Sequence, residues 1–387
     1  VEQIAGDLIP AGPQDDPRDI FSRIVATGFL TLGPKMLAED DPVKQQMDIV
    51  DDQIDTLGRA FLGLTLGCAR CHDHKFDPLP SSDYYALAGI FKSTQVMLSF
   101  RVDSKWNARA LGPAVLEQRL SQLEGDLDRL DRILVLGNQA EMTSGQRESL
   151  SKELEQVRSE YASIPKAMAV NDGPGVDLEI FLRGNHLTRG PRIPRRFPRV
   201  LAGFDQQPLP GPGSGRLALA RWMVRADHPL TARVMVNRIW QGHFGYGLVR
   251  SPDNFGHLGQ RPDNQPLLDW LARRLISDDW SIKRLHRRIM LSAAYRMSSR
   301  ANRAAQATDP DNRSLWRMNR RRMQAEVLRD SLLSLADQLD NTMGGPPLQA
   351  RAFDNLSGDG QRKKIRFDIP RRSVYLPVLR SAMYEVF

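Results

Sequence analysis

The sequence predicts a mostly α-helical protein in which two helical domains are separated by a long antiparallel helical hairpin and a small β-hairpin. Three observations support this fold class. Apolar residues recur at helical spacing in the first and last thirds of the chain. Two successive segments in the middle follow the 4-3 repeat of a heptad seam. A stretch of strand-like alternation and a proline- and glycine-rich segment then separate this seam from the later helices.

These changes of pattern divide the 387 residues into four parts. Residues 1–112 are expected to form the C-terminal part of a first domain, and residues 113–165 a helical hairpin inserted after it. Residues 166–212 contain the β-hairpin and the linker, and residues 213–387 form the second helical domain. The chain starts without a methionine and stops within an apolar run, so we expect a piece of a longer protein, truncated at both ends.

The composition is that of a globular protein with an excess of positive charge. The net charge is +8, and the arginines are concentrated in the last third of the chain. We interpret these arginines as solvated helix faces and internal ion pairs, with acidic polysaccharides or anionic surfaces as an alternative partner. No pattern typical of a nucleic-acid-binding domain accompanies them, and we expect no nucleic-acid partner. No stretch reaches the ~18 apolar residues of a transmembrane helix, so none is expected in this chain.

The first helical pattern leads to the only two cysteines of the chain. Residues 44–66 have helical periodicity, and the predicted helix delivers Cys68 at its end. A polar, proline-rich stretch follows. We expect Ser81 or Ser82 to cap a second helix over residues 83–91.

The middle of the chain predicts the helical hairpin. Apolar residues follow the 4-3 repeat from Leu116, and Gly137 is expected to end this first helix. Thr143 and Gln146 have the spacing of a capping box, which begins a second helix with the same repeat up to Tyr161. The hairpin is interpreted as structural, or as a surface for a partner.

Strand-like and then helical patterns follow the hairpin. Residues 167–170 and 176–182 are expected to pair as a β-hairpin around a turn, before a linker over residues 190–215. Helical periodicity then predicts five helices, over residues 216–225, 231–244, 266–276, 281–295 and 324–339.

A glycine-punctuated loop lies between the second and third of these helices. It runs from His243 to Gly259 and is dense in aromatic, histidine and aspartate residues. Loops of this kind often carry binding residues. We therefore consider it a candidate binding loop, with His243, Asp253 and His257 as candidate site residues.

The most specific motif of the chain is Cys68-Ala69-Arg70-Cys71-His72. The spacing Cys-x-x-Cys-His is that of c-type haem attachment, in which each thiol forms a thioether with one vinyl group of the porphyrin. The adjoining imidazole, here that of His72, then serves as the proximal iron ligand. The sequence therefore predicts a covalent haem c held by Cys68, Cys71 and His72.

The motif has three other interpretations. A thioredoxin-like redox pair stands at a helix N-terminus, whereas this pair follows a predicted helix, so the helix dipole has the wrong sign. Zinc or another divalent metal could use Cys68, Cys71 and either His72 or His74, but zinc ligand pairs are usually separated by a dozen or more residues. In this alternative His74 is a metal ligand. If the protein instead binds haem, His74 would form a hydrogen bond that supports one of the iron ligands. Two buried thiols without function remain the simplest alternative.

Together these blocks resemble the paired domains of unknown function 1549 and 1553, which occur in large secreted proteins of Planctomycetes and relatives. The resemblance implies mostly helical domains, an extracytoplasmic setting (periplasmic, secreted or at the cell surface) and a frequent association with a separate planctomycete-type cytochrome c domain. One departure is that Asn264-Gln265 stand where the family usually has histidine-proline. The blocks that carry the resemblance are residues 5–10, 68–94, 183–186, 194–201, 216–224, 228–256, 267–272, 325–330 and 371–378.

We therefore expect a secreted or periplasmic c-type haem protein that transfers electrons, with a redox partner or a neighbouring catalytic domain. Met97, His243 and His257 are candidates for the distal iron ligand. Two alternatives stay open. One is a metal-dependent hydrolase or carbohydrate-processing enzyme that uses the Cys/His cluster with acids such as Asp73, Asp77 and Asp253. The other is a non-catalytic surface scaffold.

Overall fold

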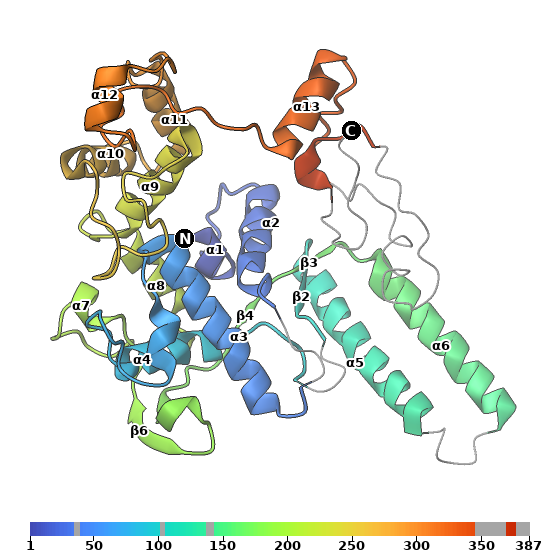
Figure 1. The fold of residues 1–387 in the computed structure, drawn as a ribbon. Helices are drawn as coiled ribbons and strands as arrows, with labels where there is room; N and C mark the ends of the chain where they lie inside the picture. The colour runs from blue at the N-terminus through green and yellow to red at the C-terminus, as the bar shows by residue number, and fades with distance from the viewer. Residues whose placement is uncertain (35–38, 101–104, 137–142, 345–368, 377–387) are drawn as a thin grey trace. The chain divides into compact units, whose positions relative to one another are not determined.

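The computed structural model describes residues 1–34, 39–100, 105–136, 143–344 and 369–376. The described chain is mostly helical, as the sequence predicted, with a few short strands (Figure 1). The helices are α1 Glu2–Ala5, α2 Pro17–Ala26, α3 Pro42–Leu57, α4 Ser81–Lys92, α5 Ala114–Leu136, α6 Ser144–Ser163, α7 Arg199–Ala202, α8 Arg216–Met223, α9 Thr231–Phe244, α10 Gln265–Ser277, α11 Ile282–Leu291, α12 Arg303–Thr308 and α13 Ala325–Leu335. The strands are β1 Thr94–Gln95, β2 Ala108–Ala110, β3 Lys166–Met168, β4 Asn171–Asp172, β5 Leu178–Phe181 and β6 Arg189–Ile193.

The chain forms two compact units. The first contains residues 1–297 and 303–316, and the second contains residues 298–302 and 317–387. The domain boundary expected at residue 212 falls inside the first unit. Helices α8 to α11 therefore belong to the same compact unit as the N-terminal helices.

The main hydrophobic core of the first unit joins the N-terminal helices to α8. Helices α3 and α4 contribute its central side chains, among them Ile54, Leu57 and Phe91. Leu219 and Met223 of α8 are buried in the same cluster. Because this core draws on sequence from both sides of the linker, the linker crosses one body of the protein rather than joining two.

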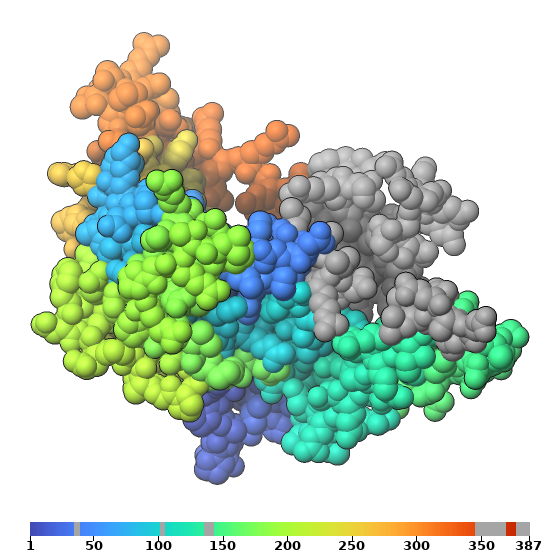
Figure 2. All heavy atoms as spheres, turned by 90° about the horizontal axis from the view of Figure 1, so that it is seen from below, coloured from blue at the N-terminus to red at the C-terminus, as the bar shows by residue number. Residues whose placement is uncertain are grey.

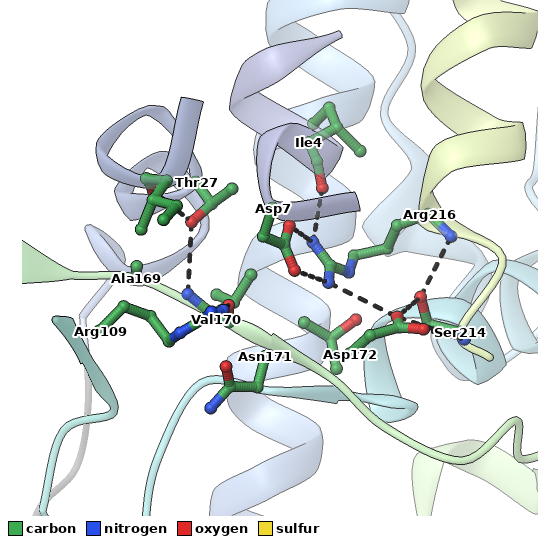
Figure 3. Close-up of polar contacts among 12 residues, drawn as sticks. Ile4, Asp7, Thr27, Arg109, Ala169, Val170, Asn171, Asp172, Ser214 and Arg216 are labelled. Atoms are coloured by element: carbon green, nitrogen blue, oxygen red, sulfur yellow. Dashed lines mark hydrogen bonds and ion pairs between the residues drawn. The ribbon is translucent and has the colours of Figure 1, made fainter. Parts of the chain in front are cut away.

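A buried ion pair reinforces this connection at the start of α8 (Figure 3). The Arg216 guanidinium is completely buried and donates two hydrogen bonds to the Asp7 carboxylate, at 2.9 and 2.8 Å. It also donates to the carbonyl oxygen of Ile4 at 2.9 Å and lies 3.5 Å from Asp172 of β4. A buried charge is tolerated only when it is paired and hydrogen-bonded. The pair therefore fixes α8 against the N-terminus of the chain.

The short strands pair differently from the sequence prediction. The predicted hairpin between residues 167–170 and 176–182 is wrong: β3 pairs with β2, β4 pairs with β1, and β5 pairs with β6, all antiparallel. Strands form within parts of both predicted segments, but periodicity does not identify the partner strand. Residues 190–193, at the start of the predicted linker, belong to β6, which pairs with β5.

Helices α5 and α6 lie side by side and pack mainly on each other (Figures 1 and 2). Leu120, Leu123 and Leu130 of α5 and Leu154 of α6 are buried, and Leu120 and Leu123 belong to a small cluster separate from the main core. The capping box of Thr143 and Gln146 is confirmed at the start of α6. Gly137, expected to end the first helix, lies outside the described residues.

The second unit is organised around α13. Arg329 donates to the carbonyl oxygens of Arg371 and Ile369, at 2.9 and 2.6 Å. The Asp330 carboxylate accepts the backbone N–H of Ser373 at 2.9 Å. These bonds attach the helix to residues 369–376. Throughout the described parts of both units, no helix combines the length and the apolar character that crossing a bilayer requires.

Candidate functional site

The cysteine motif lies beyond an interrupted helix. Helix α3 ends at Leu57 and continues as one π-helical turn over Gly58–Leu62, so the helix predicted over residues 44–66 is wrong in its last part. Gly63 has a φ of +60°, a left-handed conformation that glycine adopts without strain and that ends the helical path. A 3-10 turn, Leu66–Arg70, then carries the first cysteine.

Both thiols are available at the surface. Cys68 and Cys71 are exposed and are not joined in a disulfide. Neither lies at the N-terminus of an α-helix, since the turn that carries them follows the end of α3. The observed position therefore gives no support to a thioredoxin-like thiol.

Arg70, between the two cysteines, anchors the motif to the core. Its guanidinium donates to Asp48 at 2.8 Å and to Asp51 at 3.2 Å, both on α3. The Tyr84 hydroxyl donates to the other oxygen of Asp51 at 2.7 Å. The Tyr85 hydroxyl donates to the Arg70 carbonyl oxygen at 3.0 Å, and burial raises the pKa of Tyr85 to about 12, so the hydroxyl remains a donor. The backbone between the thiols is thus held from two sides.

A turn between β5 and β6 approaches Cys71 closely and leaves its thiol exposed. Gly184, at its centre, has a φ of +75°, and a Cβ atom there would lie 2.8 Å from the Cys71 Sγ. His186 follows and its Nε2 lies 3.0 Å from a carboxylate oxygen of Asp41. Neither Gly184 nor His186 was predicted as a site residue. The isolated glycine, with a histidine two residues later, was the available signal for a close approach to the motif.

His72 presents one free nitrogen. Its side chain is exposed, and its Nδ1 lies 2.7 Å from the Asp73 carbonyl oxygen. A carbonyl oxygen can only accept, so Nδ1 carries the proton and donates. The Nε2 lone pair is then available, which is the tautomer that a metal or an iron ligand requires.

His74 has the opposite arrangement. Its side chain is buried, and its Nδ1 accepts the backbone N–H groups of Asp77, at 2.8 Å, and Phe76, at 3.3 Å. Since these groups can only donate, the proton is on Nε2, which lies 2.9 Å from the Thr65 hydroxyl oxygen. Both nitrogens are therefore used to hold the loop together.

The three acidic candidates also have partners within the protein. Asp73 accepts the backbone N–H of Ser81 at 2.8 Å and so helps to begin α4, whereas the cap predicted from Ser81 or Ser82 is wrong, since neither side chain caps the helix. Asp253 forms an ion pair with Arg238 at 2.7 Å. Asp77 is buried, and its carboxylate accepts a backbone N–H from residue 257.

The structure brings one part of the candidate binding loop to the motif and leaves another part elsewhere. The His257 backbone N–H donates to the Asp77 carboxylate at 2.6 Å, while the His257 side chain is exposed. His243, at the end of α9, instead pairs with His286 of α11, with 2.7 Å between its Nε2 and the Nδ1 of His286. The two candidate histidines of this loop thus have different surroundings.

Met97 is the remaining candidate ligand, and it is buried in the main core with 1% of its surface exposed. No group of three or more His, Cys, Asp or Glu side chains is arranged to hold a metal ion anywhere in the described residues. The donor set at the surface is therefore two thiols and one imidazole, which fits the protein groups that hold a haem c.

Two family models match the chain. PSCyt2, a protein of unknown function (DUF1549), matches residues 1–96, and PSD1, a protein of unknown function (DUF1553), matches residues 215–387. The chain carries the paired domains DUF1549 and DUF1553. No curated protein and no solved structure matches it.

The two matches place the site within the family architecture. The cysteine motif belongs to the DUF1549 region and the loop of His257 to the DUF1553 region, while residues 97–214, with helices α5 and α6, lie outside both. Asn264 caps α10 by accepting the backbone N–H of Leu267 at 3.0 Å.

Proposed function

We propose that this DUF1549–DUF1553 protein carries one covalent haem c and transfers electrons in an extracytoplasmic compartment. The observation that carries the proposal is the combination of two exposed thiols with an imidazole whose Nε2 is free. Cys68 and Cys71 would form the thioethers and His72 would be the proximal ligand. A bound haem would supply reversible one-electron transfer.

The thiols suit this attachment chemically. Each S–H would add across one vinyl double bond, with sulfur bonded to one carbon and the thiol hydrogen to the other, so the addition would need no electron acceptor. Both thiols must be reduced and accessible for this addition, as Cys68 and Cys71 are. The bonds that hold Arg70 keep the intervening backbone in place, which limits the entropy lost when both thiols react.

Among the candidates for a distal ligand, His257 is the best supported. Met97 is enclosed in the core, His74 uses both nitrogens inside its loop, and His243 is hydrogen-bonded to another histidine. His257 has an exposed side chain on the loop that binds Asp77. A second histidine would give a lower reduction potential than a methionine.

The exposed position of the motif also suits electron exchange with a partner. A redox protein or a neighbouring catalytic domain could approach the surface at Cys68 and His72 without rearrangement of the core. Haem attachment of this type and the family resemblance both favour a periplasmic or secreted setting.

The test is to export the chain from a host that performs cytochrome c maturation. We expect a coloured protein whose haem survives acid-acetone extraction and whose mass increases by one haem. The matched control replaces both Cys68 and Cys71 by alanine, and it should fold without covalent haem. A colourless wild-type product with two free thiols would reject the proposal, and one that retains zinc through gel filtration would favour the metal alternative.

A further inference from the structure

Asp77 is the point at which the two family domains meet beside the cysteine motif. It belongs to the DUF1549 region, and its carboxylate accepts the backbone N–H of His257, in the DUF1553 region, at 2.6 Å. Asp77 is 7% exposed. A hydrogen bond to a buried carboxylate is stronger than one between neutral groups.

The same residue holds the motif loop from within. The Asp77 backbone N–H donates to His74 Nδ1 at 2.8 Å, and its carbonyl oxygen accepts the backbone N–H of Leu79 at 2.7 Å. His74 is only two residues beyond His72. A displacement of Asp77 would therefore be transmitted directly to the imidazole and thiols of the motif.

Gly256 makes the close approach of the two regions possible. A Cβ atom at this position would lie 2.3 and 2.5 Å from the two carboxylate oxygens of Asp77. These distances are well below 3.0 Å, so a larger residue at position 256 would force the Asp77 carboxylate or the loop to shift. Two residues that are distant in the sequence are thus coupled by a steric contact.

Two further contacts connect the same loop to the segment before the motif. The Phe255 backbone N–H donates to the Gly63 carbonyl oxygen at 2.7 Å. Arg238 of α9 donates to both the Arg59 carbonyl oxygen, at 2.8 Å, and the Asp253 carboxylate, at 2.7 Å. The DUF1553 loop therefore contacts the chain on both sides of the cysteines, before them at Gly63 and after them at Asp77.

We propose that Asp77 is a positioning residue and that residues 251–259 of DUF1553 hold the Cys-x-x-Cys-His segment of DUF1549 in place. The paired domains then form one site, in which one domain supplies the reactive groups and the other supplies their support. This proposal concerns the protein without cofactor, and its success or failure is independent of the proposed haem.

A double-mutant cycle tests the proposal on the full chain produced without haem. The variants are Asp77→Ala, Gly256→Ala and the two combined, with Asp77→Asn as the conservative variant. The measurement is amide hydrogen exchange by mass spectrometry. The segment over residues 66–79 and the loop over residues 251–259 report positioning, and the hairpin of α5 and α6 serves as the internal control.

Asp77→Ala and Gly256→Ala should each accelerate exchange in both segments about tenfold or more and leave the hairpin unchanged. In the combined variant the added methyl group no longer meets a carboxylate, so the second substitution should add less than about twofold to the first. Asp77→Asn retains an acceptor of the same size and should stay within about threefold of wild type.

Three results would overturn the proposal. One is unchanged exchange over residues 66–79 in Asp77→Ala, another is acceleration of equal size in the hairpin, and the third is full additivity in the combined variant. If Asp77→Ala does not fold, the cycle is repeated with Asp77→Ser, and equal exchange in Asp77→Ser and Asp77→Asn would then count against the proposal.

Discussion

The loop that carries the motif has two halves with opposite character. Residues 68–72 keep their thiols and one imidazole nitrogen at the surface, whereas the buried side chains of His74 and Asp77 in residues 73–80 accept backbone N–H groups of the protein. The contrast is sharpest between His72 and His74. A carbonyl oxygen beside Nδ1 leaves Nε2 of His72 free, and backbone N–H groups beside Nδ1 force the proton of His74 to Nε2. Histidines two residues apart thus differ in role because of the backbone group that each one meets.

The two halves of the loop have different tasks. Residues 68–72 carry the reactive thiols and imidazole, and residues 73–80 fix the loop to the rest of the protein. Substitutions in the second half are therefore expected to change stability, and those in the first half to change reactivity.

Among these substitutions, the loss of the buried ion pair at Arg216 is expected to lower the free energy of unfolding the most. Arg216→Ala would leave the Asp7 carboxylate buried without its partner, and we expect a loss of about 3–5 kcal/mol in the free energy of unfolding. Arg221→Ala on the same helix is the matched control, because Arg221 is exposed, and its effect should stay within about 0.5 kcal/mol. Urea unfolding followed by circular dichroism measures both, and equal effects would show that the pair contributes little.

The two histidines of the loop should differ in the same way. His74→Ala removes the acceptor of two backbone N–H groups in a buried loop, and we expect a loss of about 2–4 kcal/mol in unfolding free energy. His72→Ala removes an exposed side chain, and its cost should be within about 0.5 kcal/mol. Urea unfolding of the protein without cofactor gives both values. A cost at His72 as large as that at His74 would contradict the division of the loop.

The buried side chain of His228 is expected to make the free energy of unfolding depend on pH. His228 accepts the backbone N–H groups of Leu230 and Thr231 at the start of α9, and burial lowers the pKa of His228 to about 4. Because its unfolded value is about 6.5, the unfolded chain binds the proton more readily, and stability should fall as the pH decreases from about 6.5 to about 4. His228→Asn keeps an acceptor that does not titrate. The variant should therefore lose less stability than wild type between about pH 7 and about pH 5 in urea unfolding, and an identical loss would reject this role.

The features that could be predicted from the sequence are those that depend on interactions between residues close together in the chain. The helical class, the bounds of α9 and the capping box at Thr143 were predictable because they depend on neighbours within one or two turns. The strand partners were not, since β5 finds its partner through a turn at Gly184 that periodicity does not encode. The end of α3 was missed because Gly63 stops the helix by its conformation rather than by its apolar spacing.

The candidate site follows the same rule. The spacing of Cys68, Cys71 and His72 was sufficient to select the surface donors. The roles of Asp77 and His74 could not be predicted, because one depends on a backbone N–H of the distant DUF1553 region and the other on the direction in which its own loop turns.

Spectroscopy of the protein with haem extends the comparison to reactivity. In His72→Ala the thioethers remain, so we expect covalent haem with an altered Soret band and reduction potential. His74→Ala should change both much less, since its nitrogens point into the loop. Equal shifts in the two variants would indicate that both histidines ligate one metal, as in the metal alternative.

The helical hairpin should have the smallest effect on the site, because it packs on itself. We propose to delete residues 130–136 and 147–153, one heptad from each arm. This keeps the capping box and the register of the seam, because seven residues are two turns of a heptad repeat. Leu120, Leu123 and Leu154 remain to close the shortened hairpin. We expect the variant to fold, to take up haem as wild type does and to have an unchanged visible spectrum.

A matched deletion of residues 130–136 alone shifts one arm against the other and should destabilise the hairpin. If the balanced deletion abolishes folding or haem uptake, the hairpin supports the site directly, and the support would not be confined to residues 73–80 and the DUF1553 loop.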